Sequence, residues 1–263
     1  MHNLKYIFTS ILMLGTFALQ AQTVSIFPKN DLYLEDNNKG VSNITESQFN
    51  QIIDIALASY KKEARANHER LKIKRRWDDS TVNANMRRFW GTVTINMYGG
   101  LARREEIVPD SFALVVCHEL GHAYGGAPFL RSNIAAEGQA DYYGAMTCLK
   151  RIFEELPSAP INDEVITSEM IDICQEHIAN LTGAEREHEQ EFCERGLIAG
   201  FGLGKLLAVL KHEDMPSYLT PDEYETPSTM LSYPKTVQCR LDTYRAGTLN
   251  QDRPRCWYNP EDN

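Results

Sequence analysis

Two pairs of polar residues, each with a spacing of four, constrain this chain more than any other feature of its sequence. His118 and His122 form one pair, and Glu137 and Asp141 form the other. Residues i and i+4 of a helix share a face, with Cβ atoms roughly 5 to 6 Å apart, so two imidazoles at this spacing can reach one ion. Small residues surround the acidic pair, which favours a closely packed helix. The alternative is a pair of hydrogen-bonded histidines and two solvent-facing acids.

The first pair lies in the segment CHELGH, which has the arrangement H-E-x-x-H. Glu119 is one step around the helix from His118 and can reach a water on the open side of a bound metal. A catalytic zinc ion takes three protein ligands and one water, and Glu137 is the predicted third ligand. Asp141 is expected to accept a hydrogen bond from the far nitrogen of His118 and so to fix the orientation of that ring.

A second zinc arrangement would place the third ligand on the same segment. The metzincin pattern is H-E-x-x-H-x-x-G-x-x-H, and Gly125 matches its glycine. The position of the last histidine is occupied by Pro128, which cannot bind a metal. A metzincin-like site would therefore need a different third ligand.

The same motifs resemble those of the gluzincins, zinc metallopeptidases in which a glutamate on a later helix completes H-E-x-x-H. The most similar branch is the HtpX-like one. VNANM from Val82, GGLAR from Gly99, CHELGH and EGQAD each match a motif of that branch, over about residues 80 to 150. A weaker similarity lies in SYPKTVQCR, where the branch has a His-Pro pair followed by an arginine. This chain has Tyr233 before the proline, and Arg240 comes about one residue late.

The resemblance implies a peptidase in which His118, His122 and Glu137 bind one zinc ion and Glu119 is the general base. The oxyanion of the tetrahedral intermediate needs a further hydrogen-bond donor. Three residues of the late loop and helix are candidates for this donor: Tyr224, Tyr233 and Arg240. The branch's intramembrane segments have no counterpart here, so its role in membrane-protein quality control is not expected.

Periodicity and the resemblance together predict an α+β fold. We expect a zincin-like metallopeptidase domain with a small, mainly antiparallel sheet, an active-site helix and a mostly helical C-terminal half. Strands are expected from Leu71, from Val82 and in TVTINMY from Thr92, the last being a candidate edge strand for pairing with substrate. Helices are expected after the capping box of Thr45 and Gln48, from Pro109 with Asp110 as its cap, over about 132–154 and 163–180, and from Thr182 and Pro234.

The N-terminal region has the pattern of a secretory signal. An apolar run over residues 4–19 is followed by small residues, so we expect removal of residues 1–21. Residues 22–44 are expected to be a loosely ordered lead-in, and residues 45–263 a single domain. The mature protein is then secreted or periplasmic, without a membrane span.

The number of cysteines is consistent with an exported protein. All six cysteines follow the expected cleavage site, and an even number is typical of disulfides in secreted proteins. None lies in a C-x-x-C arrangement, which argues against a structural zinc site. Sequence alone leaves the pairing open, although Cys239 with Cys256 would join the tail to the last helix at modest loop length.

Charge restricts the classes of partner. The net charge of −9 and the pI near 5.3 disfavour binding to nucleic acid or to an anionic membrane. The basic run Lys61–Arg76 is interpreted as a solvated helix end followed by a strand. The predicted partner is a peptide or protein substrate. The alternative from another class is a zinc-binding or protein-binding module without catalysis, and no oligomeric state is predicted.

Overall fold

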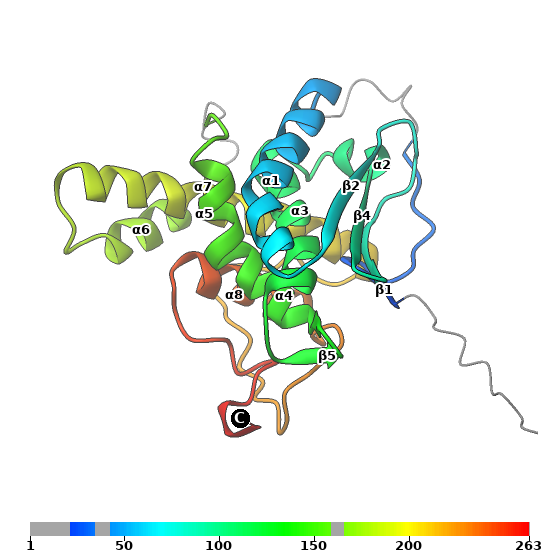
Figure 1. Ribbon diagram of the computed structural model, residues 1–263. Coiled ribbons are helices and arrows are strands. Elements are labelled where there is room, and N and C mark those ends of the chain that lie inside the picture. The colour runs from blue at the N-terminus through cyan, green and yellow to red at the C-terminus, as the bar shows by residue number, and fades with distance from the viewer. Residues whose placement is uncertain (1–21, 35–42, 159–165, 263) are drawn as a thin grey trace, which may run out of the picture.

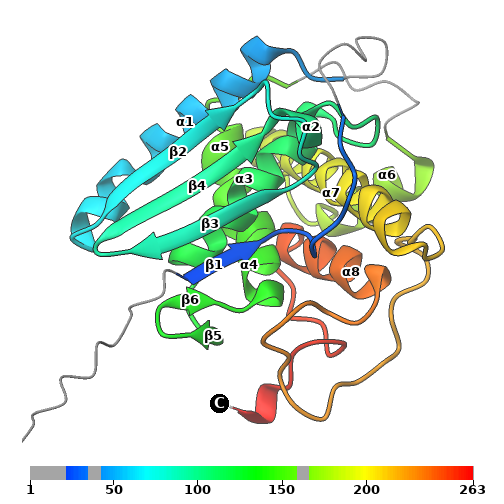
Figure 2. The same ribbon diagram turned by 90° about the vertical axis from the view of Figure 1, so that its right-hand side faces the viewer.

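The computed structural model describes residues 22–34, 43–158 and 166–262, which form an α+β fold. A small mixed sheet covers one side of a group of helices (Figures 1 and 2). In Figure 2 the outer face of the sheet is turned to the viewer, and the helices lie behind it. The signal peptide expected at residues 1–21 lies outside the described residues.

The sheet has four strands in the order β1-β3-β4-β2. Their bounds are Gln22–Ser25 for β1, Arg70–Arg76 for β2, Ala84–Phe89 for β3 and Thr92–Tyr98 for β4. β1 and β4 each pair with β3 in the antiparallel sense, but β2 and β4 are parallel. The sheet is therefore mainly antiparallel, as expected, but it contains one parallel pair. The reason is that the β3–β4 hairpin inserts β4 between β3 and β2, so β4 runs in the direction of β2.

This order also corrects the prediction that the segment TVTINMY is a sheet edge. It forms β4, which lies between two other strands, and the edges are β1 and β2. Val93, Ile95 and Met97 alternate along β4 and are fully buried beneath the sheet. The period-two pattern identified the strand correctly, but neighbours in a sheet are set by distant pairing that the pattern does not encode.

Helix α1 (Glu46–Ala66) has the predicted capping box at its start. Gln48 N–H donates to Thr45 Oγ1 (3.2 Å), and Thr45 N–H donates to Gln48 Oε1 (2.9 Å). One apolar face of α1, which includes the buried Phe49 and Tyr60, packs against the inner side of the sheet and against α3 (Pro109–Tyr124). Burial of this face holds α3 beneath the sheet.

The first part of the expected lead-in is structured rather than loosely ordered. Residues 22–34 enter the fold through β1, and Ile26 and Phe27 are fully buried. Burial of these large apolar side chains stabilises the segment by roughly 1.5–3 kcal/mol each. The alternation of Val24 and Ile26 in TVSIF was the available strand signal. Residues 35–42 of the expected lead-in lie outside the described residues.

The remaining elements follow the sheet in the chain. They are α2 (Gly99–Ala102), the hairpin β5 (Phe129–Arg131) and β6 (Ile134–Ala135), α4 (Glu137–Tyr143), a π-helical segment η1 (Gly144–Cys148), α5 (Leu149–Phe153), α6 (Ser168–His177), α7 (Gly183–Lys211), α8 (Val237–Thr248) and the short η2 (Pro260–Asp262). No described helix is both long enough and apolar enough to cross a membrane.

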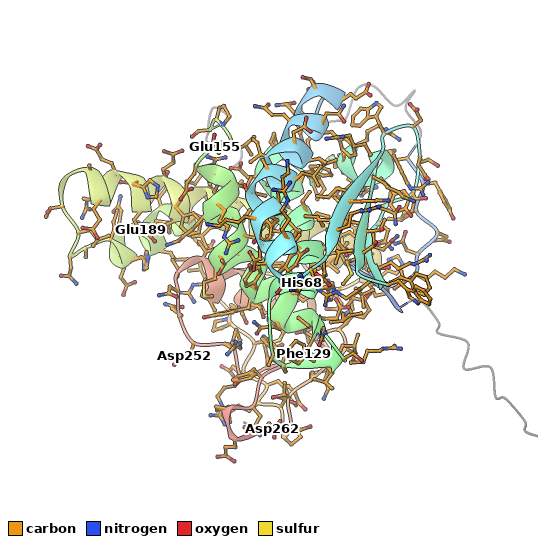
Figure 3. The ribbon with its side chains drawn as sticks, viewed as in Figure 1. His68, Phe129, Glu155, Glu189, Asp252 and Asp262 are labelled. Carbon is orange, nitrogen blue, oxygen red and sulfur yellow. A yellow bond between two sulfur atoms is a disulfide. The ribbon has the colours of Figure 1, made fainter. Side chains whose placement is uncertain are left out.

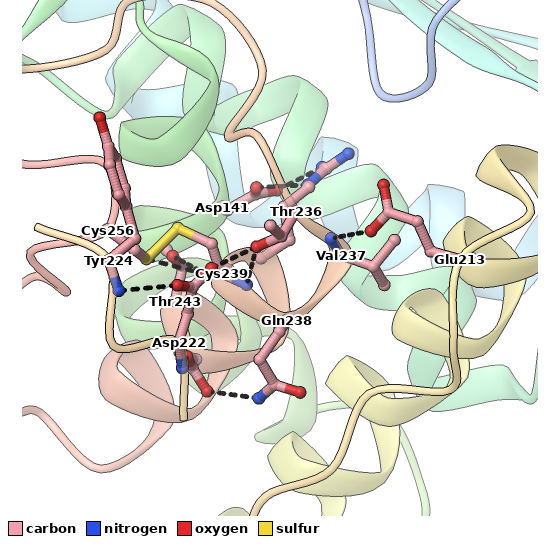
Figure 4. Close-up of a disulfide and its surroundings, with 12 residues drawn as sticks. Asp141, Glu213, Asp222, Tyr224, Thr236, Val237, Gln238, Cys239, Thr243 and Cys256 are labelled. Carbon is pink, nitrogen blue, oxygen red and sulfur yellow. Dashed lines mark hydrogen bonds and ion pairs between the residues drawn. A yellow bond between two sulfur atoms is a disulfide. The ribbon is translucent and has the colours of Figure 1, made fainter. Parts of the chain in front are cut away.

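Two expected helix starts are corrected. The helix expected from residue 132 begins at Glu137, because residues 129–135 form a hairpin. The last helix begins at Val237 rather than Pro234, because Thr236 Oγ1 accepts from the Cys239 amide (3.0 Å) and Glu213 accepts from the Val237 amide (2.8 Å; Figure 4).

Asp110 does not cap α3. Val108 is the N-cap residue and offers no side-chain acceptor, while Pro109 occupies the first helical position. The Asp110 carboxylate instead accepts two hydrogen bonds from the buried guanidinium of Arg195 on α7, at 2.9 and 3.1 Å. The acid therefore joins two helices rather than ending one.

All six cysteines form disulfides. Cys239–Cys256, which the sequence offered as a pair, is confirmed (Figure 4). Cys174–Cys193 joins α6 to the first half of α7, which together project from one side of the molecule, where Glu189 is labelled in Figure 3. Cys117–Cys148 joins α3 to η1. Three disulfides are compatible with a secreted or periplasmic protein.

Candidate metal centre

The two histidines of CHELGH lie on α3, of whose 16 residues 14 are buried. His118, Glu119 and His122 are all fully buried, in the part of α3 that faces α4. The two helices approach closely at Gly121, where an added Cβ would lie 2.6 Å from the Ala140 carbonyl oxygen. Any larger residue at Gly121 would push α4 away, so the glycine is required by the approach of the two helices.

Each histidine is held by a hydrogen bond at its Nδ1 atom. His118 Nδ1 lies 2.7 Å from Asp141 Oδ1, as predicted, and His122 Nδ1 lies 2.8 Å from the Ala135 carbonyl oxygen. A carbonyl oxygen can only accept, so His122 carries its proton on Nδ1, and the ionised Asp141 imposes the same tautomer on His118. Both Nε2 atoms are therefore free to act as ligands.

Glu137 completes the group at the start of α4. Its Oε2 atom lies 3.5 Å from His118 Nε2 and 3.6 Å from His122 Nε2. Ligands about 2.0–2.2 Å from a tetrahedral ion are about 3.3–3.6 Å from one another, and both distances from Glu137 Oε2 fit this spacing. The three ligand atoms all lie within 4.8 Å of one another. The rings are nearly perpendicular, at 85°. The described residues thus contain a His-His-Glu group that could hold a metal ion.

Five polar atoms of this group and of the neighbouring Glu119 are buried but lack hydrogen-bond partners. They are His118 Nε2, His122 Nε2, Glu137 Oε2 and both carboxylate oxygens of Glu119. A buried polar atom without a partner costs about 1–3 kcal/mol, and more where it is charged. Five such atoms at one place indicate a site for a cation and its remaining ligand rather than a structural hydrogen-bond network.

Electrostatics distinguish the three acids of the site. Burial raises the pKa of Glu137, but His122 and His118 outweigh this effect and hold the pKa at about 2. Burial likewise opposes ionisation of Asp141, yet Arg240 and His118 keep its pKa below the ordinary value. Burial dominates at Glu119 and raises its pKa to about 8. Two acids are therefore fixed as anions, while Glu119 is poised to exchange a proton near neutral pH.

Arg240 lies behind Asp141 rather than opposite the histidines. Its Nε and Nη2 atoms donate to the two carboxylate oxygens of Asp141, at 2.8 and 2.7 Å, and its Nη1 donates to the Ile26 carbonyl at 2.7 Å. The guanidinium is buried, and Asp141 has no exposed surface. This geometry assigns Arg240 to positioning Asp141, which in turn orients His118.

The two candidate tyrosines are in different places. Tyr233 Oη donates to the Ser25 carbonyl at 2.5 Å, so its hydroxyl lies at the last residue of β1. Tyr224 is partly exposed, and its hydroxyl accepts from Lys235 Nζ at 2.8 Å. The structure therefore does not bring Tyr224 into the metal centre.

Some features of the site had no signal in the sequence. The Ala135 carbonyl that orients His122 is a backbone group, and any residue type could supply it. The disulfide Cys117–Cys148 joins the residue before His118 to the segment that follows α4, and so links covalently the helices that carry the ligands. The sequence places Cys117 next to a predicted ligand, but it does not indicate which cysteine is its partner.

A second group of possible ligands is excluded. Asp222 lies close to Cys239 and Cys256, but the two sulfur atoms form a disulfide (Figure 4). A disulfide offers no thiolate to a metal. In comparisons with known proteins, no family model, curated protein or solved structure matches the chain.

Proposed function

We propose that the protein is an exported zinc-dependent peptidase of the gluzincin type, with zinc bound by His118, His122 and Glu137. The observation that carries this proposal is the convergence of five buried, unpartnered polar atoms from α3 and α4. Two imidazoles and one carboxylate are a ligand set that suits zinc, and a set of three leaves one position open, as in catalytic sites. The sequence resemblance over residues 80 to 150 supports the same assignment.

Zinc, when bound, supplies a Lewis acid and an activated water. The carboxylate of Glu119 has no hydrogen-bond partner, so it would be free to take up a proton and later to deliver one to the leaving amine. Asp141 holds the proton of His118 on Nδ1, and Arg240 keeps Asp141 ionised. Tyr233 is a candidate donor to the oxyanion once its hydroxyl leaves the Ser25 carbonyl.

The test is the Glu119→Gln variant, which keeps the size of the side chain and removes the base. We expect hydrolysis of a casein substrate by the zinc-loaded wild type and a loss of at least about 10²-fold in the variant, with equal zinc content. Glu106→Gln is the matched control, because Glu106 is also buried but pairs with Arg104, outside the metal centre. Equal activity in wild type and Glu119→Gln would exclude the proposed mechanism.

A second candidate is a zinc-binding protein without catalysis. The observation in its favour is that the ligand atoms and both Glu119 oxygens are buried. Against it, structural zinc sites usually have four protein ligands, and a structural site needs no unpaired glutamate beside the ion. Bound zinc with no hydrolysis of any peptide substrate would favour this candidate. The metzincin-like alternative needs a different third ligand, and the possible metal-binding group found among the described residues offers Glu137 in that place.

A further inference from the structure

The metal centre is covered by the first described strand and the residues that follow it. His118, Glu119 and His122 have no exposed surface, and Glu137 is 3% exposed. Ile26 and Phe27 are fully buried, and the backbone of Ile26 is close enough to Glu119 to lower the pKa of its carboxyl. A substrate therefore cannot reach the ligands while residues 22–27 keep this position.

Two side chains hold this segment through consecutive backbone carbonyls. Tyr233 Oη donates to the carbonyl of Ser25 (2.5 Å), and Arg240 Nη1 donates to the carbonyl of Ile26 (2.7 Å). These are two of the three residues that the sequence offered as donors to a scissile carbonyl. The segment thus presents peptide carbonyls to the groups that would otherwise be available to a substrate.

The segment also occupies the edge of β3. β1 pairs antiparallel with β3 over four residues, from Gln22 opposite Arg88 to Ser25 opposite Asn85, and the Ile26 amide continues the pairing to the Ala84 carbonyl (3.3 Å). Without β1, β3 would be the edge of the sheet nearest the metal centre, with free backbone donors and acceptors. A free edge of this kind binds extended peptides by strand addition.

We propose that residues 22–27 occupy the substrate site, and that the described conformation is a closed form of the enzyme. This inference rests on the proposed peptidase function. In the open form the segment leaves β3, and an extended peptide takes its place in the same antiparallel pairing. The substrate then carries apolar side chains at the buried positions of Ile26 and Phe27, because these positions lie in an apolar environment.

A cross-strand disulfide can hold the segment in place. Thr23 lies opposite Arg87, and both side chains are exposed on the outer face of the sheet. Opposite residues of two antiparallel strands alternate between hydrogen-bonded and non-hydrogen-bonded pairs, and side chains are closest in the second kind. Ile26 and Ala84 are a hydrogen-bonded pair, so Thr23 and Arg87, three positions away, are a non-hydrogen-bonded pair. The double variant Thr23→Cys/Arg87→Cys can therefore be oxidised. Mild reductant would open this exposed bond while leaving the three buried native disulfides intact, which mass spectrometry would verify.

Two readouts are measured on the full mature chain loaded with zinc: hydrolysis of an apolar peptide library, and the rate at which a chromogenic chelator extracts the zinc. We expect both to be at least about tenfold slower in the oxidised double variant than in its reduced form. The control is Arg87→Cys/Thr94→Cys, which would join β3 to β4 and leave β1 free. Its oxidised and reduced forms should behave alike.

The outcomes separate the two proposals. Equal hydrolysis and equal zinc extraction by the oxidised and reduced forms would overturn the inference, because the segment would then cover nothing that must open. Absence of hydrolysis in the wild type and in both forms would instead contradict the peptidase function and with it the substrate position. Faster zinc extraction after reduction would, in that case, still show that residues 22–27 cover the metal centre.

Discussion

The interior beneath the sheet and the outer face of the sheet both carry many charged groups, but they accommodate charge in different ways. Beneath the sheet, Arg240 makes two hydrogen bonds to Asp141, and Asp141 also contacts His118. On the outer face, no outward position of β2, β3 or β4 is acidic. Exposed cations alternate along β2, and β3 adds one more: Arg70, Lys72, Lys74, Arg76 and Arg87.

The difference separates charges that water satisfies from charges that only a fixed geometry can satisfy. An exposed lysine is hydrated wherever it points, so its position carries little information about function. A buried ion is stable only with partners at defined distances, so a buried atom that lacks a partner identifies a site. The comparison predicts large effects of substitution in the interior and small effects on the outer face.

The largest effect is expected for Arg240→Met in the metal-free protein. The variant leaves Asp141 buried without its cation, and loss of one partner of a buried pair costs about 3–5 kcal/mol. Urea unfolding at neutral pH would measure the change in the free energy of unfolding. The double variant Arg240→Met/Asp141→Leu should recover part of the loss, since it removes both charges. A cost below about 1 kcal/mol for Arg240→Met would show that the pair is not desolvated.

The next largest effect is expected for removal of the disulfide beside His118. Replacing Cys117 and Cys148 by alanine opens a loop of 31 residues and should lower the free energy of unfolding by about 2–4 kcal/mol. Zinc affinity should fall as well, because the bond joins the two ligand-bearing helices. Replacing Cys174 and Cys193 is the matched control: it should cost stability but leave zinc affinity unchanged. Equal zinc affinity in all three proteins would contradict a role for Cys117–Cys148 in the site.

Zinc binding should strengthen with pH. Burial lowers the pKa of each buried histidine, but Asp141 outweighs this effect at His118 and Glu137 does so at His122, so both values are raised in the metal-free protein. The stability that these charged rings contribute is present below their ordinary pKa and is lost as pH rises through the raised values. Zinc requires neutral rings, so its apparent affinity should rise by up to about tenfold per pH unit for each proton released. The zinc-induced increase in Tm should therefore be larger at pH 8 than at pH 6, and the reverse order would contradict the ligand assignment.

The smallest effect is expected on the outer face of the sheet. Lys72→Ala/Lys74→Ala should change the free energy of unfolding by less than about 0.5 kcal/mol and leave zinc content unchanged. Chemical denaturation and metal analysis of the purified variant would measure both. A loss of more than about 1 kcal/mol would remove the contrast between the two regions.

How much of this contrast the sequence predicted depends on the range of the interactions. Helical spacing within CHELGH and EGQAD is local, so the ligand set and the contact of Asp141 with His118 could be predicted from neighbouring residues. The position of β4 inside the sheet and the return of Ile26 to the metal centre depend on pairing between distant segments. Arg240 was identified as a site residue, but its pairing with Asp141 was not predicted, because a sequence does not indicate which carboxylate a distant guanidinium will meet.

We propose that His118, His122 and Glu137 hold one zinc ion. Zinc K-edge X-ray absorption on the protein loaded with one equivalent of zinc tests it most directly. We expect a four-coordinate ion with nitrogen and oxygen ligands at about 2.0–2.2 Å and the scattering pattern of two imidazoles. A first shell without imidazole, or one with sulfur at about 2.3 Å, would contradict it.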